Sequence, residues 1–228
     1  MTWNGVAWAG GAYLAGTIPS TWIVARAKRA SGLISASGRS AGETDPHILM
    51  AKHLGVGWTA LAATLDVLKG LVYVMAARHW GHLDQGWLAL AGVCVVVGHS
   101  FPLYAQQMAG RGVAAASGVY LALLPWEMVV AGLLIVLGGA IRSTSLFTTI
   151  GMGSVPVVAA VQRQPAEFVA MAGAVFAILM IRRLEGVGTV IRSGIRPGRA
   201  ILYRCVFDSS GPPAPAHWFR SAGEDTQR

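Results

Sequence analysis

Seven apolar stretches follow one another along the 228-residue chain and constrain its fold more than any other feature. A helix that crosses the hydrocarbon core of a bilayer needs about 20 mostly apolar residues. These stretches predict an all-α, polytopic membrane protein with about seven transmembrane helices. Five or six spans remain possible if the short fourth and fifth stretches are re-entrant. The stretches cover residues 6–25, 56–77, 87–104, 113–124, 126–141, 146–161 and 166–181.

The scarcity of charge supports the same fold class. Charged residues make up only 12% of the chain and hydrophobic residues 54%, whereas about a quarter of a soluble domain is charged. This composition excludes a soluble enzyme, a disordered chain and a nucleic-acid-binding module. The 29 glycines are typical of membrane helices, in which small residues let backbones approach closely.

The basic residues predict the orientation in the cell membrane, because Lys and Arg collect in cytoplasmic loops. With the N-terminus outside and seven spans, the outside loops hold only Arg78 and Arg163, and Lys69 lies within a span. The net charge of +8 then needs no nucleic-acid partner. Fifteen basic residues fall on the inside: Arg26, Lys28, Arg29, Arg39, Lys52, Arg111, Arg142, Arg182, Arg183, Arg192, Arg196, Arg199, Arg204, Arg220 and Arg228.

Two regions are expected. Residues 1–207 form the integral membrane domain, and residues 208–228 form a flexible cytoplasmic tail, because Pro and Gly are dense where the tail begins. Cys94 and Cys205 lie far apart and have no metal-ligand spacing, so the sequence indicates no disulfide framework or metal site. No cofactor motif is present either.

The loop after the first stretch is rich in Gly and small hydroxyl residues from position 32 to 45. Glycine lets backbone amides approach a ligand, successive amides form a concave site for an anion, and Arg39 adds charge. An ordinary solvated loop is the alternative interpretation.

Asp66 and Lys69 lie inside the second stretch, three residues apart, so both side chains can share one helix face. Charged residues at membrane depth are costly and usually line a polar interior. We expect them to pair with each other or with neighbouring spans, either as a structural lock or as part of a site.

A third polar region joins the end of the third stretch to the start of the fourth. His99 can act there as a base, a ligand or a polar anchor. The sequence Gly110-Arg111-Gly112 places a guanidinium beside the free amides of a helix N-terminus, which suits a phosphate. An Arg that merely marks the membrane edge is the alternative.

Taken in order, five segments resemble the bacterial acyl-phosphate–glycerol-3-phosphate acyltransferases. The resemblance spans roughly residues 10–195 and implies a seven-span membrane enzyme that makes lysophosphatidate. The segments are Gly16-Thr17-Ile18-Pro19, the loop from Ser37-Gly38 to Thr44-Asp45, Asp66-x-Leu68-Lys69-Gly70, Gly98-His99-x-Phe101-Pro102, and Gly110-Arg111-Gly112-Val113-Ala114.

The resemblance implies roles for individual residues. The expected catalytic residues are Ser37, His99 and Asp45: Ser37 orients a hydroxyl, and Asp45 or His99 assists proton removal from the acceptor. Acyl phosphate and glycerol 3-phosphate are the implied substrates, with membrane lipids around them. The residues implied in phosphate and substrate binding are Thr17, Gly38, Arg39, Gly42, Thr44, Lys69, Gly110, Arg111 and Gly112.

The chain also departs from the family pattern. Met108 and Arg111 stand where lysines are usual, and Arg39 and Asp45 stand where Asn is usual. The segment after Arg183 lacks the family's His and Asn. These departures keep a second interpretation open, a non-catalytic relative that binds lipid or phosphate headgroups or a membrane partner. A transporter is less favoured, because the hydropathy shows no two-fold repeat.

Overall fold

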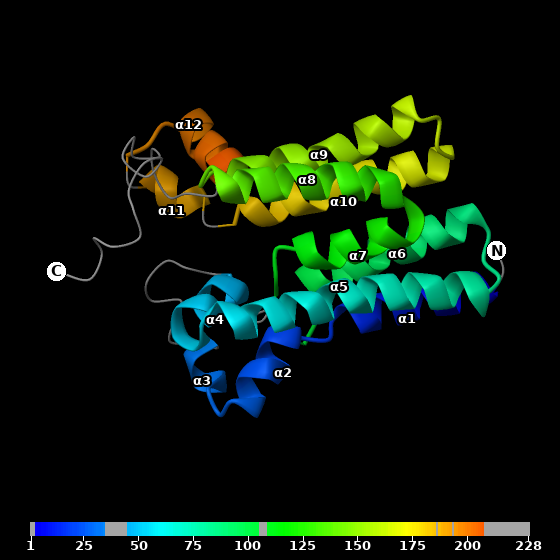
Figure 1. Cartoon of the computed structure of the whole chain (residues 1–228), viewed down its shortest axis with the longest axis horizontal. Coiled ribbons are helices and arrows are strands. Elements are labelled where there is room, and N and C mark those ends of the chain that lie inside the picture. The colour runs from blue at the N-terminus through cyan, green and yellow to red at the C-terminus, as the bar shows by residue number, and fades with distance from the viewer. Residues whose placement is uncertain (1–2, 35–44, 105–108, 186, 193, 208–228) are drawn as a thin grey trace.

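The computed structural model describes residues 3–34, 45–104, 109–185, 187–192 and 194–207. Within these ranges the regular structure is helical (Figure 1). The helices are α1 (Trp3–Gly16), α2 (Ser20–Ala27), α3 (Ser31–Ile34), α4 (Pro46–Leu54), α5 (Val56–His79), α6 (Gln85–Ser100), α7 (Val113–Leu123), α8 (Pro125–Ala140), α9 (Thr144–Val161), α10 (Ala166–Arg183), α11 (Val187–Arg192) and α12 (Pro197–Leu202), followed by a π-helical turn at Tyr203–Phe207. The predicted tail, residues 208–228, lies outside the described ranges.

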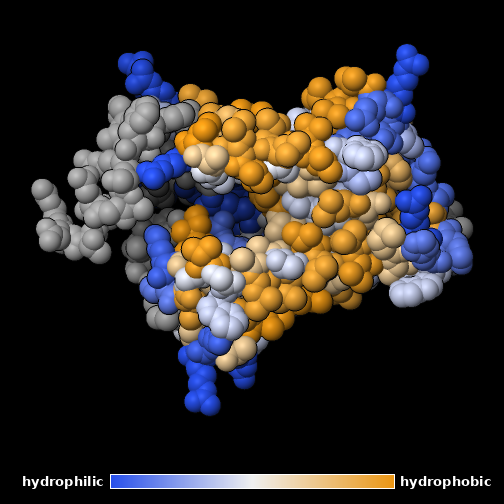
Figure 2. Space-filling model, in the orientation of Figure 1, coloured by the Kyte–Doolittle hydropathy of each residue, from blue (hydrophilic) through white to orange (hydrophobic). Residues whose placement is uncertain are grey.

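Seven of these helices, α1 and α5 to α10, correspond to the seven apolar stretches. By length and composition, α5 and α9 are each long and apolar enough to cross a membrane, and α6, α7 and α8 are shorter apolar helices. Their outer faces expose large apolar side chains, such as Val72, Leu133 and Val157. Figure 2 shows hydrophobic residues over most of one face of the bundle. An apolar surface of this extent fits a lipid environment, and the predicted all-α membrane fold is confirmed.

The first predicted span is wrong in one respect. Residues 6–25 do not form one helix, because the chain breaks between Gly16 and Ser20 into α1 and α2. Pro19 has no amide hydrogen and cannot continue the hydrogen-bond ladder of α1. The break directs α2 away from α1, toward α3 and α4 at one end of the bundle (Figure 1).

The spanning helices form two layers (Figure 1). One contains α1, α5, α6 and α7, and the other contains α8, α9 and α10. α10 packs on both α9 and α6 and so joins the layers. The main core runs through both layers and includes the fully buried residues Tyr120, Val95 and Val175.

α1 and α6 cross at a pair of glycines. A Cβ on Gly16 would lie 2.2 Å from the carbonyl oxygen of Val95, and one on Gly98 would lie 2.1 Å from that of Tyr13. The two backbones therefore touch, as small residues allow in membrane helices. This crossing places the break after α1 beside the end of α6, where His99 lies.

Candidate functional site

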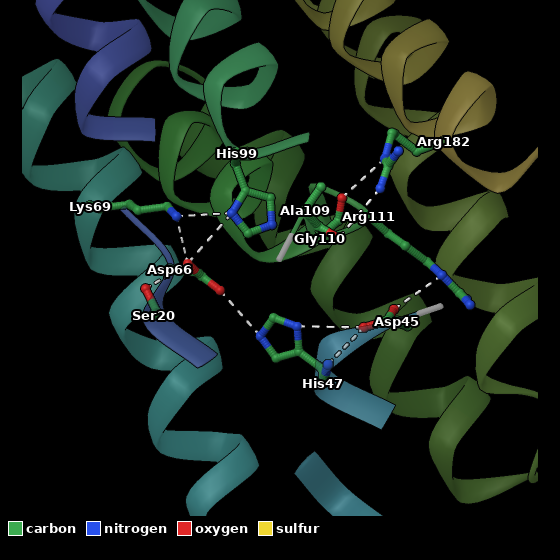
Figure 3. A network of polar contacts seen from close by, with 10 residues as sticks. All are labelled: Ser20, Asp45, His47, Asp66, Lys69, His99, Ala109, Gly110, Arg111 and Arg182. Carbon is green, nitrogen blue, oxygen red and sulfur yellow. Dashed lines mark hydrogen bonds and ion pairs between the residues drawn. The ribbon is translucent and has the colours of Figure 1, made fainter. Parts of the chain in front are cut away.

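Asp66 is the centre of a buried polar network (Figure 3). Its side chain is 1% exposed, its Oδ1 accepts a hydrogen bond of 2.7 Å from Ser20 Oγ, and Lys69 Nζ lies 2.7 Å from the same oxygen. Lys69 also donates to the carbonyl oxygen of Ile18 at 2.9 Å. The expected pairing of Asp66 with Lys69 is confirmed. The pair also ties the break between α1 and α2 to α5, because Ile18 lies in the break and Ser20 is the first residue of α2.

Two histidines complete this network. His47 Nε2 lies 3.1 Å from Asp66 Oδ2, and His99 Nδ1 lies 3.5 Å from Oδ1. Lys69 Nζ is closer to His99, at 2.9 Å from Nδ1. An ammonium group can only donate, so Nδ1 accepts and the ring proton of a neutral His99 is on Nε2.

Asp45 is the N-cap residue of α4 and links that helix to Arg111. The Asp45–Pro46 pair is a strong helix start, because Asp caps the first amides and Pro suits the first turn. Asp45 Oδ1 accepts from the backbone N–H of His47 at 2.8 Å, and Arg111 Nε lies 3.0 Å from Oδ2. A loop residue before α4 and a loop residue before α7 thus meet across the site.

Both ionisable groups at the start of α4 have shifted pKa values. Burial raises the pKa of Asp45, but the hydrogen bonds from His47 and the charge of Arg111 outweigh it and lower that pKa to about 2. Burial lowers the pKa of His47, whereas hydrogen bonds to Asp45 and Asp66 raise it to about 9. At neutral pH Asp45 is therefore a carboxylate and His47 a cation.

Glycines shape the chain on both sides of Arg111. A Cβ on Gly110 would lie 2.1 Å from His99 Nε2, so only glycine lets this loop reach the imidazole without displacing it. Gly112 has a φ of 88° and precedes the first residue of α7. Arg111 therefore stands at a helix N-terminus, where unpaired amides and the helix dipole favour an anion, as the sequence predicts.

Two arginines at the end of α10 belong to the same region. Arg182 donates to the carbonyl oxygens of Gly110 and Ala109, each at 3.3 Å, and so holds the loop that carries Arg111 (Figure 3). Arg183 donates to Thr149 Oγ1 and, at 2.9 Å, to the carbonyl oxygen of Cys205. In the sequence, both arginines indicate only basic charge after the last span.

These groups meet at a cavity of about 700 Å³. Its polar end holds Asp45, His47, His99, Arg111 and Arg183. The remainder is largely apolar and is lined by residues of α4, α5, α7, α8 and α9 and by Gly112. These residues are Ile48, Thr59, Ala63, Val67, Val113, Ala114, Ser117, Met128, Gly132, Ile135, Val136, Thr144, Ser145 and Thr148. Figure 2 shows a hollow between the two layers, with hydrophilic residues inside it and hydrophobic residues along its rims.

The structure places the predicted site residues that it describes in this cavity or directly beside it. His99, Asp45, Arg111 and Gly112 line the cavity, and Gly110 touches His99. Lys69 turns toward Asp66 and His99 instead. Thr17 lines a second, smaller space of about 10 Å³ together with His47, Asp66 and His99, roughly enough for one water. Its Oγ1 is 2.6 Å from Tyr104 Oη. Ser37, Gly38, Arg39, Gly42 and Thr44 lie outside the described residues.

The sequence pattern did not indicate a site role for four of these residues: His47, Ser20, Arg182 and Arg183. His47 carried one usable signal, since it follows the Asp-Pro helix start by one residue. Among the described residues, no group of three His, Cys, Asp or Glu side chains is arranged to bind a metal ion.

The sequence profile of the glycerol-3-phosphate acyltransferases matches residues 6–192. The chain belongs to this family. It is 33% identical to the glycerol-3-phosphate acyltransferase of Geobacter sulfurreducens over 180 residues, which cover 77% of this chain and 88% of the relative. The match to the enzyme of Geobacter metallireducens is 36% identical over 122 residues and covers 53% of this chain and 59% of that relative.

Two solved structures have the same fold. They are crystal structures of PlsY (YgiH), an integral membrane glycerol 3-phosphate acyltransferase. The glycerol 3-phosphate form superposes with a TM-score of 0.68 at 24% identity, over 84% of this chain and 94% of that one. The lysophosphatidic acid form gives 0.68 at 23% identity, over 87% and 98%. This glycerol-3-phosphate acyltransferase family member is therefore a multi-pass membrane protein.

Proposed function

We propose that the chain transfers an acyl group from acyl phosphate to the sn-1 hydroxyl of glycerol 3-phosphate, giving lysophosphatidate and inorganic phosphate. One observation carries this proposal: a single cavity joins a polar end with two arginines to an apolar groove between membrane helices. An acyl phosphate has the same division into an anionic head and an alkyl chain. The second substrate and the phosphate product are anions that the polar end also suits.

The phosphate groups bind at the polar end. Arg111 offers a planar guanidinium that can grip two phosphate oxygens, and it stands beside the first amides of α7. Arg183 lines the same end. The Gly-rich loop that contains Gly38, Arg39 and Gly42 supplies further amides and charge, with Ser37 and Thr44 orienting hydroxyls.

The chemical step needs little from the protein beyond position and charge, because an acyl phosphate is already activated. The sn-1 oxygen attacks the carbonyl carbon, and the bond from that carbon to the phosphate oxygen breaks. The hydroxyl proton leaves with the phosphate. Arg111 neutralises charge on the leaving group, and the alkyl chain stays in the groove.

The geometry favours particular roles for Asp45 and His99, the two titratable residues expected to assist proton removal. A carboxylate with a pKa of about 2 is a weak base, so Asp45 fixes Arg111 rather than taking the proton. His99 accepts from Lys69 at Nδ1, so its Nε2 is a donor. We place His99 as a hydrogen-bond donor to a substrate oxygen at the polar end.

We also propose that the N-terminus is outside the cell, that the basic C-terminal part and the motif loops are cytoplasmic, and that residues 208–228 form a cytoplasmic extension. Fifteen basic residues fall in the segments assigned to the cytoplasm and two in the outside loops, which supports this orientation. The N-terminus and helices α11 and α12 lie at opposite ends of the bundle (Figure 1), as an odd number of spans requires.

A turnover assay tests the proposal. Purified protein is given glycerol 3-phosphate with either palmitoyl phosphate or palmitoyl thioester, and lysophosphatidate is followed by mass spectrometry. We expect product from the acyl phosphate and little from the thioester. If neither donor gives product although glycerol 3-phosphate binds, the chain is a non-catalytic relative.

A further inference from the structure

The apolar part of the cavity has a defined direction along α8. Thr144 and Ser145 at the start of α9 line the cavity, and Arg183 bonds to Ser145. α8 leads directly into α9, so the C-terminal half of α8 is nearest the charges. Val136 is therefore close to the polar end, and Met128, in the first turn of α8, is at the far end.

Three lining residues of α8 mark this path at intervals of one turn: Val136, Gly132 and Met128. Positions four apart share a helix face, and eight residues span about 12 Å along the axis. Met128 is 9% exposed and packs in the main core, so it closes the groove at depth. Gly132 leaves the wall open halfway along.

Helix packing does not account for Gly132. A Cβ at this position would meet no heavy atom within 4 Å, although glycine inside a helix costs about 1 kcal/mol relative to alanine. Gly138 on the same helix differs, because a Cβ there would lie 2.3 Å from Phe147 Cβ. The empty space beside Gly132 belongs to the groove.

We propose that Gly132 and Met128 set the length of the acyl chain that the protein accepts: Gly132 admits the chain past the middle of α8, and Met128 stops it. This inference rests on the proposed function, since it assigns the groove to the alkyl chain of the donor. A side chain at position 132 then competes with the distal methylenes of a long donor and leaves a short donor undisturbed.

The test compares donors from octanoyl to stearoyl phosphate on the parent, Gly132→Leu and Gly139→Leu. Gly139 is the matched control: it lies in α8, a Cβ there also meets nothing within 4 Å, and it does not line the cavity. One methylene in an apolar pocket is worth about tenfold or more in specificity. We expect Gly132→Leu to lower kcat/KM for palmitoyl phosphate relative to octanoyl phosphate by at least about tenfold, with no such change for Gly139→Leu.

Met128→Ala supplies the opposite change. It deepens the groove, so kcat/KM for stearoyl phosphate should rise relative to palmitoyl phosphate. A graded Gly132→Ala variant, which adds one methyl, keeps the test valid if Met128→Ala fails to fold. An unchanged chain-length profile in folded Gly132→Leu would overturn the inference, even with the parent fully active.

Binding measurements separate this inference from the proposed function. If the parent makes no lysophosphatidate, the proposed function fails. The dissociation constants of octyl and hexadecyl phosphate then test whether the groove binds the alkyl chain. Gly132→Leu should weaken hexadecyl phosphate binding by about tenfold relative to octyl phosphate. Equal ratios in parent and variant would contradict the assignment of Gly132.

Discussion

Arg111 Nε lies 3.0 Å from Oδ2 of Asp45, which joins the loop before α7 to the start of α4. Asp45 keeps its negative charge because His47 and Arg111 stabilise it. The arginine proposed to bind phosphate is therefore held in place by a carboxylate before the substrate arrives. In the proposed function an incoming phosphate would compete with or share this contact, so we expect the pair to influence substrate affinity.

Replacement of Arg111 tests its role as a phosphate ligand. Arg111→Ala should weaken glycerol 3-phosphate binding by about 1.5–3 kcal/mol, the usual contribution of a hydrogen bond to a charged group. Arg111→Lys should retain part of the affinity, because charge remains but the bidentate geometry is lost. Isothermal titration of the detergent-purified protein measures both. Equal affinity of the parent and the Ala variant for glycerol 3-phosphate would mean that Arg111 only marks the cytoplasmic side of the membrane.

Lys69→Met tests the buried pair. The change leaves Asp66 as a buried carboxylate without its nearest cation, and breaking a buried pair costs about 3–5 kcal/mol. We expect a large fall in thermal unfolding temperature in detergent. Lys52→Met on α4 is the control and should change it little. A Lys69→Met protein that unfolds like the parent would show that His47 and Ser20 suffice to hold Asp66.

The pKa of His47 predicts a loss of stability at alkaline pH. Its pKa is raised from 6.5 to about 9 on folding, so its contribution is fully present below pH 6.5 and is lost as pH rises through about 9. Unfolding temperatures measured between pH 6 and 10 should fall across this window, and His47→Gln should flatten the fall. The pKa of Asp45 is lowered to about 2, so its contribution is lost only as pH falls from about 4 toward 2. A parent and a His47→Gln variant with parallel pH profiles would contradict the ion pairs around His47.

Cysteine labelling tests the proposed orientation. Single cysteines are placed at Trp80 in the loop after α5 and at Ser221 in the tail, in a background that lacks Cys94 and Cys205. A membrane-impermeant maleimide should label the Trp80→Cys protein in intact cells and the Ser221→Cys protein only in inside-out vesicles. Labelling of Ser221→Cys from outside would refute the orientation and the cytoplasmic placement of the site.

The spacing of residues predicts much of the site. Asp66 and Lys69 pair because residues three apart share a helix face, and Gly110 to Gly112 precede a helix as expected. The break at Pro19 was not predicted, because residues 6–25 remain apolar across it. The positions of Arg182 and Arg183 in the site were not predictable either. The preference of basic residues for cytoplasmic segments already explains why they follow the last span. Their partners Gly110 and Thr149 are distant in the sequence.

The release of phosphate during turnover tests the central claim most directly. Purified protein is mixed with palmitoyl phosphate, with and without glycerol 3-phosphate, and inorganic phosphate and lysophosphatidate are quantified together. We predict one phosphate for each lysophosphatidate, release that depends on glycerol 3-phosphate, and loss of both products in Arg111→Ala. Phosphate release without glycerol 3-phosphate, or undiminished lysophosphatidate formation in Arg111→Ala, would contradict the account.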